Sequence, residues 1–397
     1  MPWPIPTLRA RPAAVPLRWR NWITIFIVIM VCGAALALYC WPHGKTDRQL
    51  ELWLLAIGAP AVVFLAMLGA RLTHYGQAKL RHDVWEKARL RVAGEWKQWT
   101  RKSKVVAKAS VFLPPGLNVS VWLDENPRLP VNLDRCVSLG WSFASTAEQW
   151  VTHLLGLVAE RFVQDISTTK SPLEVQFLLD AQTYSELQVR VFDATSVFAS
   201  LLKMAGVEIE VTVVTKMAVA IDHISDWMDK TRTNPVLLIA GQRSSIEDPA
   251  LYSEGACALL FCPDDASVLS RGPAATGIFR PMVSNVKALK VDVAQLLFAQ
   301  STADMPIDVW HTGLDGNAKG DVLTALSIAT GGLAANERDM RQNRFDEAAG
   351  IPGPVSSWIA MSLAILASPR RCRSQLIVSA STGKSMAICM VSELNVD

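Results

Sequence analysis

Two long apolar runs near the N-terminus precede a series of shorter apolar and amphipathic segments. Residues 21–44 contain no Asp, Glu, Lys or Arg, and residues 52–70 form a second uncharged run between Glu51 and Arg71. A bilayer core of roughly 30 Å requires roughly 20 apolar residues, so each run is long enough to cross it. We predict a transmembrane hairpin over 21–71, with a buried core hairpin as the alternative. A cleaved signal peptide would have a shorter apolar run and a small-residue cleavage site.

Hydrophobic residues then recur at three- and four-residue spacing over 76–104, which predicts an amphipathic helix. They are Leu80, Val84, Ala88, Val92, Trp96 and Trp99. Lys and Arg occupy the other faces, so we assign 72–108 to a basic juxtamembrane helix. Such a helix packs on the membrane surface, packs on the following domain, or forms a site for a partner.

Beyond Pro114, Pro115 and Gly116 the hydrophobic pattern alternates between strand and helix periods. Strands are predicted at 118–125, 173–181, 207–215, 235–242, 255–263, 307–313, 374–381 and 385–393. Helices are predicted at 146–165, 186–206, 216–231, 286–300, 321–333 and 355–368. This alternation predicts a layered α/β domain over 109–397, in approximate halves 109–280 and 281–397. The wholly apolar segment 235–242 is typical of a covered central strand.

Charge is distributed unevenly along the chain. Residues 1–108 carry 17 basic and 5 acidic residues and the remainder carries 22 and 31, so the net charge of +3 hides a basic stem and an acidic domain. Lys and Arg concentrate before the first run (1–20) and after the second (71–108). The positive-inside rule therefore places both flanks in the cytoplasm of a bacterial inner-membrane protein, with the loop near Gly44 in the periplasm. The acidic domain argues against nucleic-acid binding.

Common catalytic and cofactor motifs are absent. The chain contains no GxxxxGK[ST], GxGxxG, GxSxG or HExxH sequence, and its seven cysteines lack CxxC or Cys/His ligand spacing. Ser244 and Ser245 follow a predicted strand without a nucleophile-elbow pattern, and Asp222 and His223 are adjacent on a predicted helix and point apart. We therefore expect no metal or cofactor.

Four segments in order resemble a shortened β-ketoacyl synthase of the thiolase-like fold. TKMAVAIDHISDWMDKTRTNPVLLIAGQ (215–242) is similar to the helix after the synthase nucleophile and the buried strand beyond it, and SEGACALLFCPDD (253–265), followed by Arg271 and Gly272, to its GEGA-type strand. VWHTGLDGNAKGDVLTAL (309–326) is similar to the HGTGT segment, and VSASTGKSMAICMVSE (378–393) to the closing hairpin. The resemblance covers roughly residues 170–397 and implies a thiolase-like fold.

The chain lacks most of the catalytic residues that this resemblance implies. Condensing enzymes use a cysteine thiolate at a helix N-terminus and two imidazoles. The nucleophile position falls at about Thr215, and the second histidine is missing from AAGIPGP (348–354). Only His311 matches, in a changed HTGLDG context, and the glycine-rich hairpin turn is replaced by Ser381 to Ser385. We expect a scaffold without catalytic residues.

The combination of two spans and a degenerate thiolase-like domain also resembles the type VI lipase adapter family, through segments such as NPVLLIAGQRSS (234–245). That resemblance implies a partner: a phospholipase effector, the secretion spike protein, or both. The competing hypothesis is a divergent acyl-transfer or hydrolytic enzyme. A further alternative is an effector immunity protein, which the predicted cytoplasmic placement disfavours.

Overall fold

The structure, a computed structural model, describes residues 3–4, 6, 9–40, 49–125, 128–141, 146–169, 171–244, 252–264, 276–300, 306–330, 340–381, 383 and 385–394. Their contacts form two compact units. One is Ile5–Lys97, and the other is a globular unit made of Met1–Pro4 and Gln98–Asp397.

The first unit is helical. Its elements are α1 (Trp19–Cys40), α2 (Gln49–Trp53), the π-helical turn η2 (Leu54–Gly58) and α3 (Ala59–Thr100), which ends in the globular unit. α1 and the continuous helical stretch Glu51–Thr100 are long and apolar enough to cross a membrane, by length and composition. They pack closely, because a Cβ added at Gly33 would lie 2.2 Å from the Pro60 ring and Phe26 contacts Phe64 at 4.9 Å between ring centroids.

α3 carries the second apolar run directly into the basic stem. The helix ends at Thr100, so the predicted helix 76–104 is too long at its C-terminal end. The next element is a strand, β1 (Ser103–Phe112), which the sequence pattern did not predict and which crosses the domain start that we placed at residue 109.

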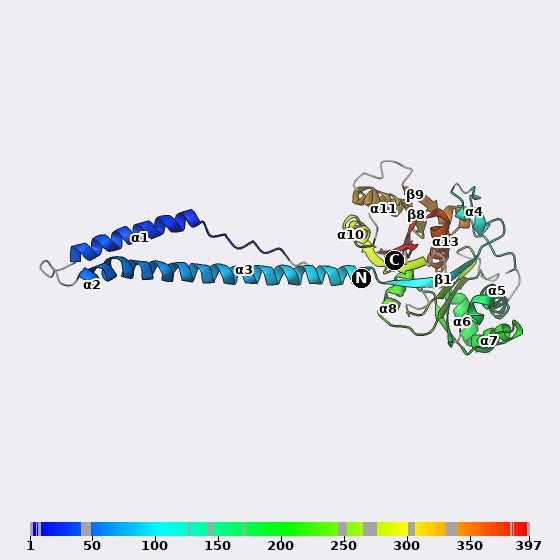
Figure 1. Ribbon diagram of the computed structural model, residues 1–397. Coiled ribbons are helices and arrows are strands. Elements are labelled where there is room, and N and C mark those ends of the chain that lie inside the picture. The colour runs from blue at the N-terminus through cyan, green and yellow to red at the C-terminus, as the bar shows by residue number, and fades with distance from the viewer. Residues whose placement is uncertain are drawn as a thin grey trace. The chain divides into compact units, whose positions relative to one another are not determined.

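The globular unit is built on one mixed sheet (Figure 1), which has eleven strands within the described residues. Its other strands are β2 (Leu173–Leu179), β3 (Val211–Met217), β4 (Val236–Gln242), β5 (Gly255–Phe261), β6 (Thr276–Phe279), β7 (Met282–Asn285), β8 (Ile307–Thr312), β9 (Met340–Arg344), β10 (Ser374–Ala380) and β11 (Ser385–Glu393). Its helices are α4 (Val119–Leu123), α5 (Ala147–Ser167), α6 (Ala181–Val189), α7 (Ala194–Met204), η3 (Ile221–His223), α8 (Ile224–Met228), α10 (Leu289–Gln300), α11 (Gly316–Ala329), α12 (Phe345–Ala349) and α13 (Ser356–Arg371).

The strand order reveals an internal duplication. The sheet runs β3-β2-β4-β5-β1-β6-β11-β10-β8-β9, with β7 added beside β11. Read from one end, the first half of the sheet is β3-β2-β4-β5-β1; read from the other end, the second half is β9-β8-β10-β11-β6. The two orders are the same when β1 to β5 are matched in turn to β6, β8, β9, β10 and β11. The pairing directions also repeat, because β2 pairs in parallel with β3 and β4 as β8 does with β9 and β10, and the remaining pairs are antiparallel. The halves meet where β1 pairs with β6.

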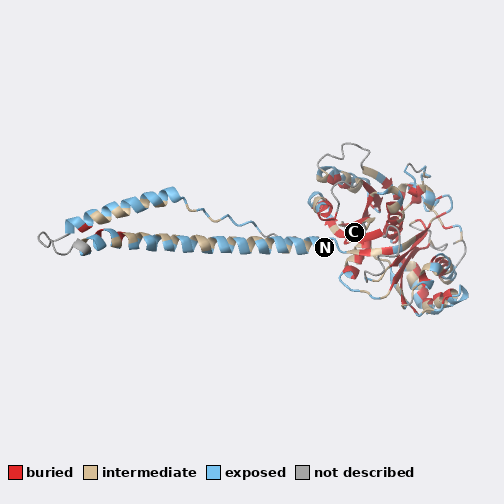
Figure 2. Ribbon diagram, in the orientation of Figure 1, coloured by how far each residue is buried: buried red, intermediate tan, exposed pale blue. Residues whose placement is uncertain are grey.

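Two apolar clusters hold helices on the sheet. α13 is buried along most of its length and packs on β1, β5, β10 and β11 (Figure 2). A second cluster joins α5 and α7 to the other face of β2 and β4. α5 begins at a capping box, in which the Thr146 hydroxyl accepts from the Gln149 amide and the Gln149 side chain accepts from the Thr146 amide.

Several predicted elements are confirmed. The predicted strand 235–242 is β4, buried at every position between β2 and β5. β10 and β11 form the predicted C-terminal hairpin, and β10 also pairs in parallel with β8. The helices predicted at 146–165, 286–300, 321–333 and 355–368 correspond to α5, α10, α11 and α13.

Other predicted elements are wrong. Residues 118–125 contain the short helix α4 instead of a strand, because the Asn118 side chain caps the Ser120 amide and turns the chain. The single helix predicted at 186–206 is two helices, since Val191 adopts φ 54° and Asp193 caps α7 afresh. The predicted helix 216–231 is reduced to η3 and α8 because β3 continues to Met217.

The extreme N-terminus packs on the globular unit. Trp3 is 5% exposed, and its indole Nε1 donates to the Pro281 carbonyl at 3.1 Å. Its ring meets Trp99 edge-on at 6.1 Å, and the Arg280 guanidinium lies 4.1 Å from the centre of the Trp99 ring. Residues 5–97 therefore leave the globular unit and return to it.

Candidate functional site

The position expected for a nucleophile does not have the geometry of one. Thr215 lies inside β3, opposite Phe177 of β2, and β3 forms one end of the sheet order. The next helical turn begins only at Ile221. The Thr215 hydroxyl is therefore not at a helix N-terminus, where a dipole could lower the pKa of a nucleophile.

The seven cysteines all lie in the described residues, and none is at a helix N-terminus. Cys257 and Cys389 are fully buried in β5 and β11, and burial raises the pKa of both thiols, to about 12 for Cys257. Cys372 is exposed, but it caps the C-terminal end of α13, where the helix dipole disfavours a thiolate. No cysteine in this set has the environment of an acyl acceptor.

His311 lies near the C-terminal end of β8, as the resemblance implies, and its side chain points away from α13. It is in β8 after Trp310, whose ring packs against Trp122 at 5.9 Å in the cluster around α13. Because successive strand residues point to opposite faces, His311 points to the other face of the sheet. Burial, together with the charges of Lys319 and Arg344, lowers the pKa of His311 to about 4. The imidazole is therefore neutral near pH 7.

The segment expected to carry the second histidine is packed closed. In the 348–354 segment, the Ile351 amide donates to the Arg135 carbonyl at 3.0 Å, and the Ile351 carbonyl accepts from the Ser253 amide at 2.8 Å. Gly350 has φ 88°, and a Cβ there would lie 2.3 Å from the Arg135 carbonyl oxygen. The space under this segment is about 10 Å³, room for about one water molecule. It does not provide an acyl-binding channel.

Thr215 lies in β3 and His311 in β8, which are near opposite ends of the sheet order. The structure also shows no cluster of three or more His, Cys, Asp or Glu side chains suited to a metal within the described residues. Ser245 lies outside those residues, as do Asp265, Arg271, Gly272, Thr382 and Lys384. Ser244 donates its amide to the Glu254 carboxylate at 2.8 Å and follows β4 without forming an elbow.

Comparison with known proteins supports the fold but assigns the chain to no family. No family model matches the sequence, and no curated protein matches it. The fold is similar to ketosynthase twelve of the bacillaene polyketide synthase of Bacillus amyloliquefaciens, with 11% identity, TM-score 0.51, and 75% of this chain and 74% of that chain covered. It is also similar to the module 1 ketosynthase of the bacillaene synthase of strain FZB42, with 11% identity, TM-score 0.52, and 75% and 77% covered. The globular unit therefore has a thiolase-like, ketosynthase-like fold.

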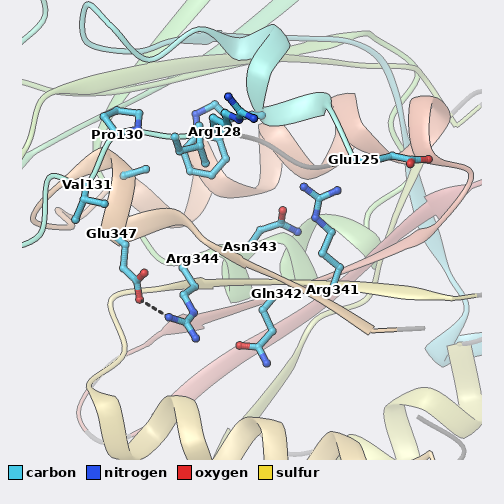
Figure 3. A pocket seen from close by; sticks show the side chains of 12 residues that line it. Glu125, Arg128, Pro130, Val131, Arg341, Gln342, Asn343, Arg344 and Glu347 are labelled. Atoms are coloured by element: carbon cyan, nitrogen blue, oxygen red, sulfur yellow. Dashed lines mark hydrogen bonds and ion pairs between the residues drawn. The ribbon is translucent and has the colours of Figure 1, made fainter. Parts of the chain in front are cut away.

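A groove that the sequence did not predict lies at the other end of the sheet. It has a volume of about 530 Å³ and lies between β9 and the chain segment that follows α4. Figure 3 shows Arg341 and Asn343 on β9, with Arg128 on the opposite wall. The sequence signal is weak, because β9 reads MRQNR and has no apolar alternation.

A buried ion-pair cluster supports one wall of the groove. Asp308 is fully buried and pairs with Arg371 and Arg373, each at 2.6 Å. Arg371 also donates to the Asn343 side-chain oxygen at 3.3 Å, and to the carbonyls of Trp122 and Asp124 at the end of α4. Two guanidinium groups therefore share one carboxylate.

Arg341 extends this cluster into the groove. It pairs with Asp308 in the β8–β9 register, so both side chains are on the same face. Burial and the neighbouring Arg371 lower the pKa of Arg341. Within the described residues, neither Arg341 nor Arg128 has an ion pair with a carboxylate. The groove lining therefore combines arginine with glutamate side chains: Arg128, Arg341 and Arg344 with Glu125 and Glu347.

Proposed function

We propose that this protein is a non-catalytic scaffold, anchored in a membrane, that binds a protein partner through its globular unit. The observation that carries the proposal is the separation of the expected catalytic positions. Thr215 is in a strand, His311 is buried with a lowered pKa, and the 348–354 segment is packed closed. Condensation by this fold needs a thiolate and positioned proton donors, so the arrangement favours binding over turnover.

Membrane anchoring is supported by the two apolar helices and by the N-terminal contact. α1 and Glu51–Thr100 would give two membrane crossings. Trp3, which precedes both helices, donates to Pro281 of the globular unit, which follows them. Both flanks of the hairpin then lie on one side of the membrane. The Lys and Arg distribution makes that side the cytoplasm of a bacterial inner membrane.

The finer proposal is that the partner is a phospholipase effector loaded onto the type VI secretion spike, or the spike protein itself. Its support is the resemblance in layout to the type VI lipase adapters: two spans, a basic stem and a thiolase-like domain without catalytic residues. The acidic globular unit also fits a protein partner better than a nucleic acid.

One observation favours the competing hypothesis of an enzyme. Within the described residues, buried polar atoms without hydrogen-bond partners lie near the ends of β8 and β10: both nitrogens of His311 and the hydroxyl of Ser379. Unsatisfied buried groups are uncommon and often mark functional sites. An acyl-transfer or hydrolytic activity would have to use this cluster.

Two measurements on the full chain in detergent or nanodiscs separate these functions. The first is release of free thiol from acyl-CoA and acyl-carrier thioesters, with His311→Ala as the matched variant. We expect no release above background from either protein. The second is a pull-down with a phospholipase effector encoded by a neighbouring gene, which we expect to be retained.

Release that disappears in His311→Ala would overturn the scaffold, whatever the pull-down gives. Absence of both release and effector retention would remove the lipase-adapter assignment.

A further inference from the structure

We propose that the chain before α1 is a releasable strap that fastens the last turn of α3 to the sheet of the globular unit. Trp3 is the fastening point, and the stretch around Arg9 and Arg11 lies against α3. When the strap is closed it holds the last turn of α3, and when it opens that turn loosens. This inference goes beyond the proposed function, and it does not depend on the identity of the partner.

Trp3 docks where two distant parts of the globular unit meet. Its ring packs edge-on against the Trp99 ring at 6.1 Å between centroids, and its Nε1 donates to the Pro281 carbonyl at 3.1 Å. Trp99 is in the last turn of α3, and Pro281 is in the connection between β6 and β7. Because Trp3 is only 5% exposed, it joins the end of the helix to this connection through nearly its whole surface.

The docking site for Trp3 is held together without Trp3. The Arg280 guanidinium lies 4.1 Å from the centre of the Trp99 ring, and its Nε donates to the Trp99 carbonyl at 3.2 Å. The same guanidinium is 2% exposed and pairs with Asp229 at 2.5 Å. None of these contacts involves Trp3, so we expect the site to persist when Trp3 leaves it and to accept Trp3 again.

A second contact guides the same chain along α3. The Trp85 Nε1 donates to the Arg9 carbonyl at 3.0 Å, and the Arg11 guanidinium lies 4.3 Å from the centre of the Trp85 ring. This contact is exposed to solvent, where hydrogen bonds and cation–π contacts are weak. It therefore positions the strap, whereas the buried Trp3 ring holds it.

The strap has few contacts to lose when it opens. Among the described residues of 3–18, Trp3 alone is buried. Segments with few buried contacts open locally at a fraction of the free energy of global unfolding. Prolines restrict the open chain and so reduce the entropy that docking costs, and this segment contains Pro2, Pro4, Pro6, Pro12 and Pro16. The docking of one ring therefore decides whether the strap is closed.

Limited trypsin digestion of the full chain in nanodiscs tests the strap. Trp3→Ala should raise the rate of cleavage after Arg9 by at least about tenfold, because cleavage follows the population of the open form. Trp3→Phe keeps a ring but loses the Nε1 donor, so its rate should lie between the two. Trp19→Ala, at a tryptophan of α1 that is 59% exposed, is the matched control and should leave the rate unchanged.

Hydrogen exchange of the same proteins measures the end of α3 itself. In Trp3→Ala the amides of residues 98–102 should exchange at least about tenfold faster, while those of β4 and α13 keep their protection. Unchanged cleavage and exchange in Trp3→Ala, or an equal effect of Trp19→Ala, would overturn the strap. Protection lost from β4 and α13 as well would also overturn it, because Trp3 would then belong to the cooperative core.

Photo-crosslinking identifies the chain that supplies the strap. A photoreactive phenylalanine analogue replaces Trp3, and copies labelled with different nitrogen isotopes are mixed before reconstitution. We expect crosslinked peptides that contain Trp99 or Pro281 and carry one isotope only, as a strap closing on its own chain requires. Crosslinks that join the two isotopes would show that a second copy occupies the site, which would overturn the proposal.

Discussion

At the scale of single residues, His311 is the one histidine that matches the ketosynthase-like pattern, and the structure buries it. The histidine is 2% exposed in β8, with no hydrogen-bond partner for either ring nitrogen among the described residues. Its environment favours the neutral ring, because burial and two nearby cations oppose protonation. A buried imidazole that is neutral near pH 7 is expected to make the stability of the globular unit depend on pH.

His311 should make the globular unit sensitive to acid. Its pKa is lowered from the usual 6.5 to about 4. The stabilisation that its neutral form contributes is therefore fully present above about pH 6.5 and is lost as the pH falls toward 4. Between about pH 7.5 and 4.5, the unchanged protein should lose about 2–3 kcal/mol more unfolding free energy than His311→Leu. The measurement is urea unfolding of the detergent-solubilised full chain, followed by tryptophan fluorescence.

Asp346 provides the control of opposite sign. Burial raises the pKa of this carboxyl, although the Gly313 amide lowers it. Its contribution to stability is present at low pH and is lost as the pH rises through its folded-state pKa. Asp346→Asn should therefore steepen the acid loss. An identical pH dependence of His311→Leu and the unchanged protein would show that the imidazole is not the titrating group.

The sequence could predict that His311 matches the family histidine, but it could not predict which face of the sheet its side chain points to. The HTG context places a histidine at a strand end. The sheet face that the histidine occupies changes if the strand shifts by one residue. Trp310 decides that register, because its large ring fills the cluster with Trp122 and Phe345. The groove residues Arg341 and Asn343 carried even less signal, since a polar edge strand resembles a loop in sequence.

At the scale of elements, buried segments were predicted well and exposed or interrupted ones were not. β4 is apolar up to its last residue, and α13 is apolar from Trp358 to Ala367 except at Ser362, so the burial of these segments follows from composition. β9 has no apolar run. The helix predicted at 186–206 failed at Val191, whose positive φ no hydrophobic pattern reveals. Local capping and turns therefore decided the elements that periodicity missed.

The closed segment before α13 gives a prediction at this scale. Gly350→Ala would put a methyl group 2.3 Å from both the Arg135 carbonyl oxygen and the Ser253 hydroxyl, at a φ of 88°. We expect a loss of about 2 kcal/mol or more, from strain and from displaced hydrogen bonds. Thermal unfolding of the full chain would measure this as a lower Tm.

Gly156→Ala is the matched control with the opposite sign. Gly156 lies inside α5, and a Cβ there meets no atom within 4 Å. Alanine should stabilise this helix by about 0.5–1 kcal/mol. A Gly350→Ala protein as stable as the Gly156→Ala protein would show that the 348–354 segment has room to move and is not sealed.

At the scale of the whole molecule, the duplicated sheet depends on its first strand. β1 pairs with β5 of its own half and with β6 of the other half. β1 also contains Lys104, whose side chain is 4% exposed and pairs with Asp264 at 2.6 Å. The strand that directly follows the stem is thus the join between the halves, so the stem and the sheet centre are continuous in the chain.

The topology of the membrane hairpin is predicted from charge. A reporter that functions only in the cytoplasm should be active when fused after Asp397. A reporter that functions only in the periplasm should be active when inserted near Gly44, which lies outside the described residues. The reason is the excess of Lys and Arg on both flanks of the hairpin. A C-terminus found in the periplasm would contradict the cytoplasmic scaffold.

The Trp3 contact has a consequence for the order of assembly during synthesis. Its acceptor on Pro281 is made 278 residues later in the chain. At about 5–20 residues per second, the N-terminus waits about 15–60 s before its docking surface exists. Both apolar helices leave the ribosome well before then, so insertion is expected to precede docking. The Trp3 contact is therefore expected to form late in folding, after residues 5–97 have been made and inserted. In any chain truncated before Pro281, Trp3 would lack this acceptor and remain exposed.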